Sequence, residues 1–222
     1  MRQFLNNIHW GDKLIDILVV VLGITIAFAL NNWRENRQNA TLEQQYLSNL
    51  KEDLVKDSIT LDYSINYADE LFSSIGRIQR LANRSSNADS IAIYLQDVGN
   101  DNLLIFKPED YSYNTLQQTG SITIIVNDSI PKSLFQLHDT YELLEIQTDM
   151  GFRYQYERLF PYYYNYDYQI KKTIDNQLYL TSEFRNTILF YASNLRERRR
   201  LMRDALNKIN ILVGLIDEEL DE

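Results

Sequence analysis

Side chains that could carry out catalysis or bind metals are few in this sequence. The two histidines, His9 and His138, are far apart in the chain, and neither lies at metal-ligand spacing from acidic residues. Cysteine is absent, which excludes disulfides, thiol catalysis and cysteine-based zinc sites. No Glu-x-x-His pair, glycine-rich phosphate loop, Walker pattern or G-x-S-x-G motif is present. We therefore expect a protein that is not an enzyme, with no metal centre and no cofactor.

One acidic residue has an unusual setting. Asp16 lies near the start of the apolar run IDILVVVLGITIAFALNNW, residues 15–33, and no charge follows it from Ile17 to Leu30. An ionisable residue in a membrane span is a functional-site candidate. Three interpretations are open. Asp16 reaches water at the headgroups from the first turn of a span, it takes part in helix association, or it carries protons, as in ion-driven stator subunits with one acid near the start of a single span.

The apolar run predicts one transmembrane helix over residues 11–33. Crossing about 30 Å of hydrocarbon takes about 20 helical residues. The two tryptophans of the chain, Trp10 and Trp33, bracket the run. At about 1.5 Å per residue they are about 35 Å apart, close to the spacing of the two interfacial aromatic belts. The alternatives are a signal peptide, because residues 27–29 form a small-x-small triplet that signal peptidase accepts, and a buried core helix.

One face of this helix has the residue types of a helix–helix contact. At 100° per residue, Asp16, Gly23, Ala27 and Asn31 fall within one narrow stripe. Small residues spaced four apart let two helix backbones approach closely in lipid, and polar groups on the same face favour another helix over acyl chains. These four residues are therefore the predicted transmembrane packing face.

Composition predicts a helical protein that does not bind nucleic acid. The net charge is −9 and the pI is about 4.8, which argues against a nucleic-acid partner. Seven glycines and three prolines in 222 residues are far below the usual share of about 12%, so few turns are expected. We predict an all-α fold: one N-terminal transmembrane helix continuing into an elongated antiparallel helical bundle with long coiled-coil-like N- and C-terminal helices. The expected parts are an N-terminal tail (1–10), the span (11–33) and a bundle domain (34–222) with a long helix at 34–84, shorter helices over 88–178 and a C-terminal helix at 183–221.

Two runs of residues at alternating steps of three and four predict the long helices. The first seam consists of Leu47, Leu50, Leu54, Asp57, Leu61, Ser64, Ala68, Leu71, Ile75, Ile78 and Ala82. The second seam consists of Ile188, Ala192, Leu195, Arg199, Met202, Leu206, Ile209, Val213, Ile216 and Leu220.

Each seam contains one charged residue, Asp57 in the first and Arg199 in the second. A buried polar residue at such a position commonly sets the register between helices. We expect Arg199 to pair with Asp57 or with Asp69. The surrounding basic run, residues 196–203, is either an anionic-ligand patch or a solvated face.

The region between the seams is less regular. Its expected elements, in chain order, are a short helix at 85–98, a loop at 100–106, a helix at 108–119 stopped by Gly120, an extended piece at 121–126, and a helix capped by Asp128 or Ser129 that runs to about Leu159 and is ended by Pro161.

Residues 152–169, FRYQYERLFPYYYNYDYQ, contain nine aromatic side chains, seven of them tyrosine. Tyrosine buries a large area and keeps a polar tip, so this density suits a contact surface. Three interpretations remain open: packing at the end of the bundle, a surface for a protein partner, or a carbohydrate or peptide site. The candidate partner surface consists of Tyr162, Tyr163, Tyr164, Tyr166 and Tyr168.

The segments VLGITIAFALNNWRENR, LEQQYLSNLKEDLVKD and YNTLQQTGSITIIVNDSIPKSLFQLHDTYELLE together resemble an uncharacterised family of single-span membrane proteins common in Bacteroidota. In that family a span ending in Asn-Asn-Trp leads into a long helix and then a Tyr-x-x-Leu-x-x-x-Gly element. The matching residues here are Asn31, Asn32 and Trp33, then Tyr113, Leu116 and Gly120. The resemblance implies a bacterial inner membrane, an N-terminus in the cytoplasm and a periplasmic bundle. It implies no activity, because none is established for the family.

These observations favour a non-enzymatic single-pass membrane accessory or scaffold subunit. It would assemble through its span and its bundle, with a partner membrane complex or with itself. The alternatives are a membrane-anchored sensor or ligand-binding bundle, and a proton-linked stator-like subunit that uses Asp16. The expected partners are the lipid bilayer and a protein, either foreign or a second copy. Nucleic acid is not expected, and a small-molecule ligand is left open.

Overall fold

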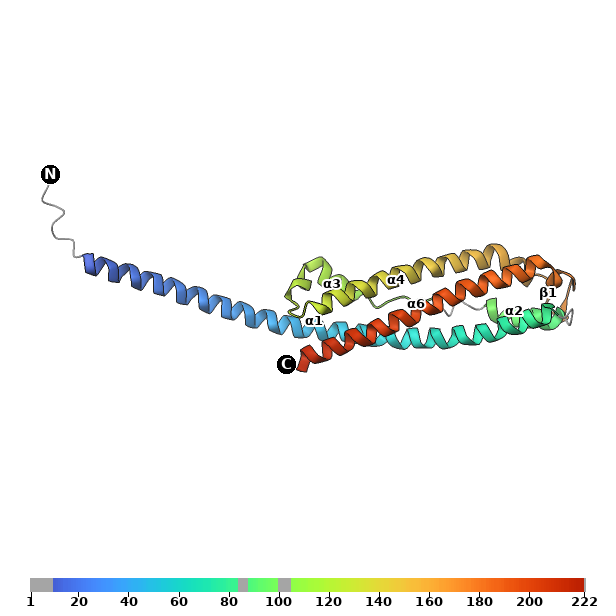
Figure 1. The fold of residues 1–222 in the computed structure, drawn as a ribbon, viewed down its shortest axis with the longest axis horizontal. Coiled ribbons are helices and arrows are strands. Elements are labelled where there is room, and N and C mark those ends of the chain that lie inside the picture. Colours follow the sequence, from blue (N-terminus) through green and yellow to red (C-terminus); the bar gives the residue numbers. More distant parts are fainter. Residues whose placement is uncertain (1–9, 84–87, 100–104, 222) are drawn as a thin grey trace, which may run out of the picture. The chain divides into compact units, whose positions relative to one another are not determined.

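The computed structural model describes residues 10–83, 88–99 and 105–221, with side chains from residue 17 onward. The described chain is all-α apart from one short hairpin (Figure 1). Its elements are α1 (Trp10–Asn83), α2 (Ala88–Gly99), α3 (Tyr111–Thr119), α4 (Ser129–Tyr154), α5 (Phe160–Tyr163), the antiparallel strands β1 (Tyr166–Asp167) and β2 (Lys172–Thr173), and α6 (Ser182–Asp221). The helical class and the long N-terminal helix are those expected from the sequence.

The chain divides into two compact units, residues 1–46 and residues 47–222. In the first unit, the described residues all belong to the beginning of α1. The second unit holds the rest of α1 and every other element, and it contains the hydrophobic core.

Within the second unit, polar contacts between side chains show the register of the long helices. The Lys51 ammonium lies 2.5 Å from Asp217, and Arg199 pairs with Asp69, so residue numbers rise along α1 as they fall along α6. On the other side of α6, the Lys208 ammonium donates to the Thr140 hydroxyl of α4 at 2.6 Å. Helix α6 therefore contacts both α1 and α4.

The first seam of α1 is buried at all of its predicted positions, from Leu47 to Ala82, and Asp57 is buried with the rest. The spacing alone was enough to identify this face, because a residue repeat of three and four returns to the same side of a helix. The seam supplies one wall of the core of the second unit.

The buried face of α6 differs from the predicted seam. Met202, Ile209 and Ile216 are buried as expected, but the positions that alternate with them are half-buried: Arg199, Leu206 and Val213. The buried alternates are one residue earlier: Arg198, Ala205 and Leu212. The physical reason is that α6 also packs against α4, which turns its buried face towards that helix.

The segment 121–126 was predicted to be extended, and this is wrong. Ser121–Ile124 forms a tight 3-10 turn directly after Gly120, whose φ of 71° ends α3 in the left-handed conformation. The Gly120 carbonyl accepts hydrogen bonds from the Thr123 amide at 3.3 Å and the Thr123 hydroxyl at 2.9 Å. Local hydrogen bonds therefore override the β-branched composition, which has no neighbouring strand to pair with.

The ends of the helices between the seams also differ from expectation. Helix α3 begins at Tyr111 instead of residue 108. Pro161 does not end the helix after α4: a wide π-helical turn, Gln155–Leu159, leads into α5, and Pro161 occupies the first turn of α5, where a missing N–H costs little. Asp128 makes no capping hydrogen bond with its side chain; the Ser129 amide donates to Asn127 Oδ1 instead, at 3.0 Å.

The range predicted for the shorter helices, 88–178, is not helical near its end, where it contains the β1–β2 hairpin. Its turn is closed by Lys171 with a positive φ of 54°, and the Asp89 carboxylate accepts hydrogen bonds from the Thr173 amide and hydroxyl, both at 2.7 Å. The loop predicted at 100–106 falls mostly outside the described residues.

Candidate functional site

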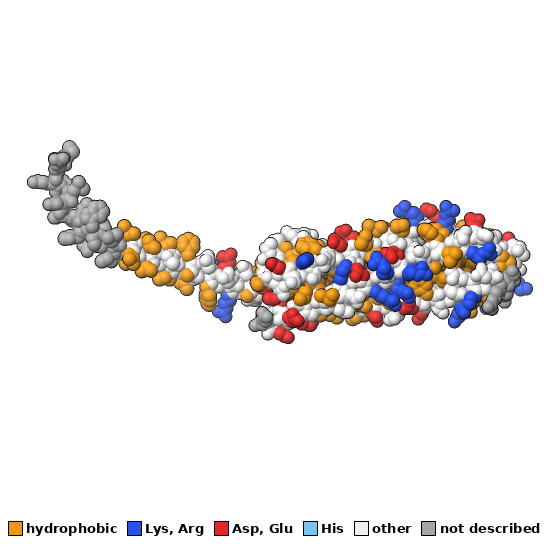
Figure 2. All heavy atoms as spheres, in the orientation of Figure 1, with side chains coloured by type: hydrophobic (Ala, Val, Ile, Leu, Met, Phe, Trp, Pro, Cys, Tyr) orange, Lys and Arg blue, Asp and Glu red, His pale blue; other side chains and the backbone are white. Residues whose placement is uncertain are grey.

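The apolar segment of α1 has no protein cover among the described residues. By length and composition, one described helix could cross a membrane, and no residue of its most apolar window is buried. The side chains from Ile17 to Leu30 are all exposed, and hydrophobic atoms follow one another along this part of the helix (Figure 2). This exposure does not fit the alternative of a core helix in a soluble domain, which would be surrounded by protein.

The predicted packing face lies in this segment. Gly23, Ala27 and Asn31 are exposed, and a Cβ added at Gly23 would meet nothing within 4 Å. At the end of the segment the Arg37 guanidinium lies 5.7 Å from the centre of the Trp33 ring. Trp10 and Asp16 belong to α1, but their side chains lie outside the described residues. The roles of these residues in packing, anchoring or proton transfer stay predictions.

Asp57, the charged residue of the first seam, is the centre of a buried polar cluster. Its side chain is only 2% exposed. The Glu109 amide donates a hydrogen bond to Asp57 Oδ1 at 2.8 Å, and the Tyr141 hydroxyl donates to Asp57 Oδ2 at 2.7 Å. One turn away on α1, Asp53 accepts a hydrogen bond from the Ser112 amide at 3.1 Å. These two acids therefore hold the backbone before and at the start of α3 against α1.

The electrostatics of this cluster follow from its burial. Loss of water raises the pKa of Asp57 to about 6, although the hydrogen bonds from Glu109 and Tyr141 favour the charged form. Burial and the neighbouring carboxylate also raise the pKa of Tyr141, so its hydroxyl keeps its proton and acts as the donor. Both Asp57 oxygens accept hydrogen bonds from protein groups, which suits a positioning role better than attack on a substrate.

His138 joins the same cluster through aromatic contacts. Its ring is stacked on Tyr113 with 3.4 Å between centroids, and it meets Tyr141 edge-on at 5.5 Å. Burial lowers the pKa of His138 to about 4, so the imidazole is neutral at physiological pH. The Tyr-x-x-Leu-x-x-x-Gly element thus has a structural explanation: Tyr113 stacks on His138, Leu116 is fully buried, and Gly120 ends α3.

Arg199 pairs with Asp69, one of its two predicted partners, and not with Asp57. Its guanidinium also lies 4.6 Å from the centre of the Phe72 ring, and Arg203 reaches the second Asp69 oxygen at 3.4 Å. Whether Arg199 sets the register stays a prediction. The fully buried arginine of α6 is its neighbour Arg198, which the spacing did not indicate.

Arg198 occupies the contact between α6 and α4. Its guanidinium lies 5.4 Å from the centre of the Phe152 ring. Gly151 makes room for it: a Cβ at that position would lie 3.3 Å from an Arg198 nitrogen and 2.5 Å from Asn194 Oδ1. The Asn194 amide donates to the Gln147 carbonyl at 3.2 Å, so Gly151 permits a close polar contact between the two helices.

The tyrosine-rich segment is divided between packing and exposure. Tyr162 and Tyr166 are buried, and the Tyr179 hydroxyl donates to the Tyr162 carbonyl at 2.9 Å. Tyr164 is 71% exposed and Tyr168 58%. The five candidate tyrosines therefore do not form one surface.

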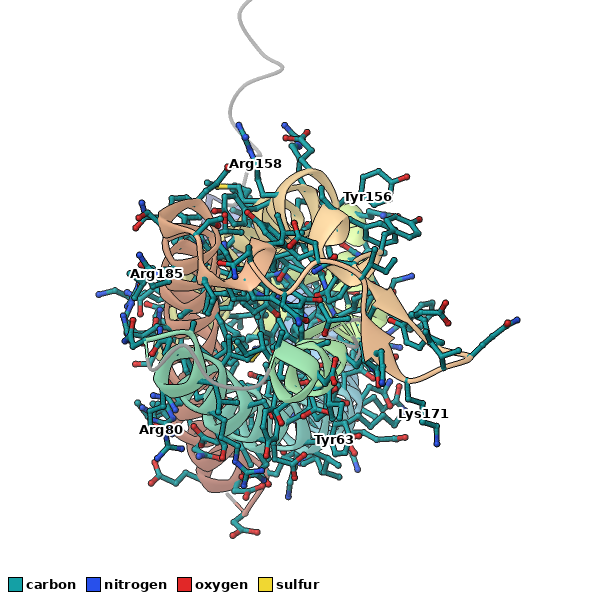
Figure 3. The ribbon with its side chains drawn as sticks, turned by 90° about the vertical axis from the view of Figure 1, so that its right-hand side faces the viewer. Tyr63, Arg80, Tyr156, Arg158, Lys171 and Arg185 are labelled. Atoms are coloured by element: carbon teal, nitrogen blue, oxygen red, sulfur yellow. The ribbon has the colours of Figure 1, made fainter. Side chains whose placement is uncertain are left out.

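The exposed tyrosines border a cleft of about 400 Å³ that is lined by Gln96, Gly99, Phe160, Tyr163, Tyr164 and Tyr168. The end view in Figure 3 shows Tyr156, Arg158 and Lys171 projecting outward from this part of the molecule. Among the described residues, no group of three or more histidine, cysteine or acidic side chains could hold a metal ion.

The described chain is thus an all-α protein with one long apolar N-terminal helix and a helical unit that contains a buried polar cluster. It belongs to the protein family DUF6090, a family of unknown function, whose family model matches residues 16–177. The matched region contains the apolar segment, the first seam, Asp57 and the residues around it. Comparison with curated proteins and with solved structures finds no match.

Proposed function

We propose that this protein is a non-enzymatic single-pass membrane subunit with an accessory or scaffold role. Its apolar N-terminal helix anchors it in a bacterial inner membrane, with the N-terminus in the cytoplasm and an antiparallel helical bundle in the periplasm. The bundle and the span assemble with a partner complex or with further copies. The observation that carries the proposal is the uncharged stretch from Ile17 to Leu30, whose side chains are exposed throughout.

Exposure on this scale is costly in water. Burying a leucine, isoleucine or phenylalanine side chain is worth about 1.5–3 kcal/mol, and this stretch leaves every one of its large apolar side chains uncovered. A lipid bilayer removes that cost along the whole segment. Trp33 and Arg37, directly after it, are the residue types that anchor a span at the interface.

The buried polar residues support a scaffold better than an enzyme. Asp57 is the acid with a strongly raised pKa that a search for catalytic groups would select first. Both of its oxygens, however, accept hydrogen bonds from protein groups that hold neighbouring segments in place.

Membrane insertion and topology can be tested together, because the chain has no cysteine. Single cysteines at the exposed positions Ile59 and Ile211 would be labelled with a membrane-impermeant maleimide in intact spheroplasts. Labelling without permeabilisation, with the protein resisting alkaline extraction from membranes, is the expected result. Release by alkaline extraction would overturn the span, and labelling only after permeabilisation would reverse the topology.

Assembly through the span can be tested at its small-residue face. Gly23→Ile with Ala27→Ile would keep the segment apolar but prevent close approach of another helix. The matched control is Thr25→Ile with Ala29→Ile, on the opposite side of the same helix. We expect the first pair to break the complex seen by mild-detergent extraction and the control to preserve it. Unchanged assembly in both would refute the packing face.

A ligand-binding sensor is the second candidate function, and the aromatic cleft beside Phe160 is the observation that favours it. The cleft is lined by tyrosines, Phe160 and Gln96, a lining suited to a ligand with apolar faces and hydroxyl groups. Tyr164→Ala with Tyr168→Ala would then abolish a thermal shift produced by such ligands. If a panel of soluble glycans and peptides gives no shift with the unsubstituted protein, this candidate fails.

A further inference from the structure

Helix α4 has a second apolar face that nothing in the described chain covers. Leu143, Ile146 and Met150 are spaced by three and four residues and are 54–57% exposed. Single exposed apolar residues are normal on a protein surface, but three at this spacing form a continuous stripe along one helix. We call these three residues the α4 stripe.

The α4 stripe borders a groove between α4 and α6. The groove has a volume of about 770 Å³, and Ile146, Met150 and the half-exposed Phe190 of α6 form its apolar lining. The charged side chains that line the same groove are Asp149 and Arg153 on α4, Glu157 after it, and Arg196 and Glu197 on α6, where Glu197 forms an ion pair with Arg200. Beside the apolar strip, Asp149 is therefore an acid on one helix and Arg196 a base on the other.

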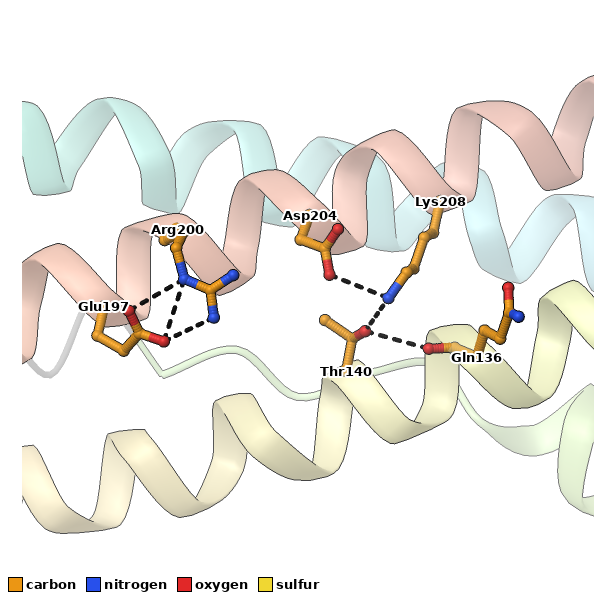
Figure 4. A network of polar contacts seen from close by, with 6 residues as sticks. All are labelled: Gln136, Thr140, Glu197, Arg200, Asp204 and Lys208. Carbon is orange, nitrogen blue, oxygen red and sulfur yellow. Dashed lines mark hydrogen bonds and ion pairs between the residues drawn. The ribbon is translucent and has the colours of Figure 1, made fainter.

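The register between α4 and α6 extends this charge pattern. Lys208 bonds to Thr140 at 2.6 Å, and Figure 4 shows this contact with the neighbouring Lys208–Asp204 and Arg200–Glu197 pairs. Near the other end, Asn194 bonds to the Gln147 carbonyl. In this register three exposed acids of α4 lie at the same height along the helices as three exposed arginines of α6: Asp149 with Arg196, Glu145 with Arg200, and Glu142 with Arg203.

This pattern of charges indicates which molecule binds the α4 stripe and in which direction its helix runs. Suppose that two copies are related by a twofold axis parallel to α4, with their α4 stripes in contact. The acids on α4 of each copy then face the arginines on α6 of the other copy at the same height along the helices. If the two α4 helices run antiparallel about Ile146, Glu142 of one copy faces Asp149 of the other, and like charges meet. Charge complementarity therefore favours a parallel pair over an antiparallel one.

We propose that the α4 stripe is the docking surface for a second copy of this chain, with the two α4 helices packed in parallel. The stripes of the two copies interdigitate, and Asp149 of each copy faces Arg196 of the other. This inference deepens the scaffold proposal and rests on it for the membrane setting. It is carried by the groove and by the level charges, neither of which involves the apolar N-terminal segment.

The first experiment uses the absence of cysteine in the full chain. Leu143→Cys, Ile146→Cys and Met150→Cys would be made singly and oxidised in native membranes, with exposed Ile59→Cys and Ile211→Cys as controls. A parallel pair places each stripe residue beside its own counterpart, so all three stripe variants should form disulfide-linked dimers well above the controls. An antiparallel pair would instead give disulfide-linked dimers with Ile146→Cys alone, and Leu143→Cys would form a disulfide only with coexpressed Met150→Cys. That result would overturn the parallel arrangement. Stripe variants no better than the controls would overturn the docking surface.

A charge exchange tests the complementarity. One Met150→Cys variant carries Glu145→Lys and Asp149→Lys, and a second, differently tagged, carries Arg196→Glu and Arg200→Glu. Each alone would place like charges opposite each other and should lose most of its dimer. Coexpression restores opposite charges on both flanks, so a mixed dimer should return to the level of the parent. No recovery on coexpression, with both variants keeping the parent's helical circular dichroism, would refute the pairing.

The two proposals can fail separately. The Met150→Cys variant would also be tested with Gly23→Ile and Ala27→Ile. If dimers persist there but alkaline extraction removes the protein from membranes, the membrane proposal fails and the α4 docking surface stands. If the protein stays in the membrane and no stripe variant forms dimers, the docking surface fails and the membrane anchor stands.

Discussion

Asp57→Asn is the substitution that most directly tests the role of the buried cluster. Asparagine has nearly the same shape as aspartate, and it can still accept a hydrogen bond from Glu109 and meet Tyr141 with its amide group. The substitution therefore removes a buried titration and leaves the packing nearly unchanged. Its effect should be read in the pH dependence of unfolding, because the pKa of Asp57 is raised from 3.8 to about 6 in the folded protein.

The direction in which Asp57 changes the stability with pH follows from proton binding. Since the folded protein holds a proton on Asp57 more readily than the unfolded chain does, this group adds stability at low pH and loses that contribution as pH rises through about 6. A difference of about two pKa units is worth about 3 kcal/mol in full. Integrated for this one group, the gain is about 1 kcal/mol between about pH 7.5 and 5.2, and about 2.5 kcal/mol by about pH 4.

The titration of His138 changes the stability of the fold in the opposite direction over the same pH range. The pKa of His138 is lowered from 6.5 to about 4, so the unfolded chain binds a proton first. Its contribution to stability is lost as pH falls from about 6.5 towards 4. The two titrations partly cancel in the unsubstituted protein. Asp57→Asn leaves only the histidine, so the substituted protein should become progressively less stable than the parent on acidification.

The measurement is urea unfolding of the full chain in detergent, followed by helical circular dichroism. The range from pH 7.5 to 5.2 remains above the pI of about 4.8. The control is Asp62→Asn, at an exposed position on the same helix. We expect the stability difference between Asp57→Asn and the parent to change by about 1 kcal/mol across this range, and the control difference to stay constant. A difference that does not vary with pH would refute a raised pKa for Asp57.

Four further substitutions give separate tests. Tyr141→Phe removes the donor to a charged acceptor, so urea unfolding at neutral pH should show a loss of about 1.5–3 kcal/mol, and the titration of Asp57 should move to higher pH. Gly151→Ala places a Cβ 2.5 Å from a side-chain oxygen of α6 and should lower the free energy of unfolding by about 1–3 kcal/mol in the same assay. In Gly76→Ala the added Cβ meets nothing within 4 Å, so this substitution should raise the free energy of unfolding by about 0.5–1 kcal/mol. Asp16→Asn should leave membrane association and the co-purifying complex unchanged if the protein is a scaffold. Loss of a cellular function at an unchanged protein level would favour the stator-like alternative.

The first seam shows what periodicity can predict. Its positions from Leu47 to Ala82 are buried because one side of α1 faces the core along the whole second unit. A constant repeat is sufficient when the same side of a helix meets its neighbours throughout. The apolar segment from Ile17 to Leu30 could also be predicted from the sequence, because a run without charges has no charged face to turn towards water.

The second seam shows where the same reasoning fails. A strict heptad assumes one partner helix, and α6 has two, α1 and α4. Arg199 lies on the side of α1 and reaches Asp69, while Arg198 turns towards α4 and is fully buried. The sequence places four arginines within five residues, 196 and 198–200, and spacing alone cannot choose among them. Gly151, which accommodates Arg198, lies on a different helix, so the spacing within α6 does not connect the two.

The surroundings of Asp57 depend on residues that periodicity cannot connect. Tyr141 is 84 positions away and Glu109 is 52. A seam pattern predicts that a side chain is buried, but a buried carboxylate also needs donors. The hydroxyl that the first seam contains, that of Ser64, donates to the Thr60 carbonyl instead. The donors come from the region between the seams, which is the least regular part of the sequence. That region satisfies the one charged position of the α1 seam. Its irregular stretch at 105–110, before α3, is therefore as necessary to the helical unit as the long helices, and substitutions there should disturb Asp57 before they disturb the apolar positions of the seam.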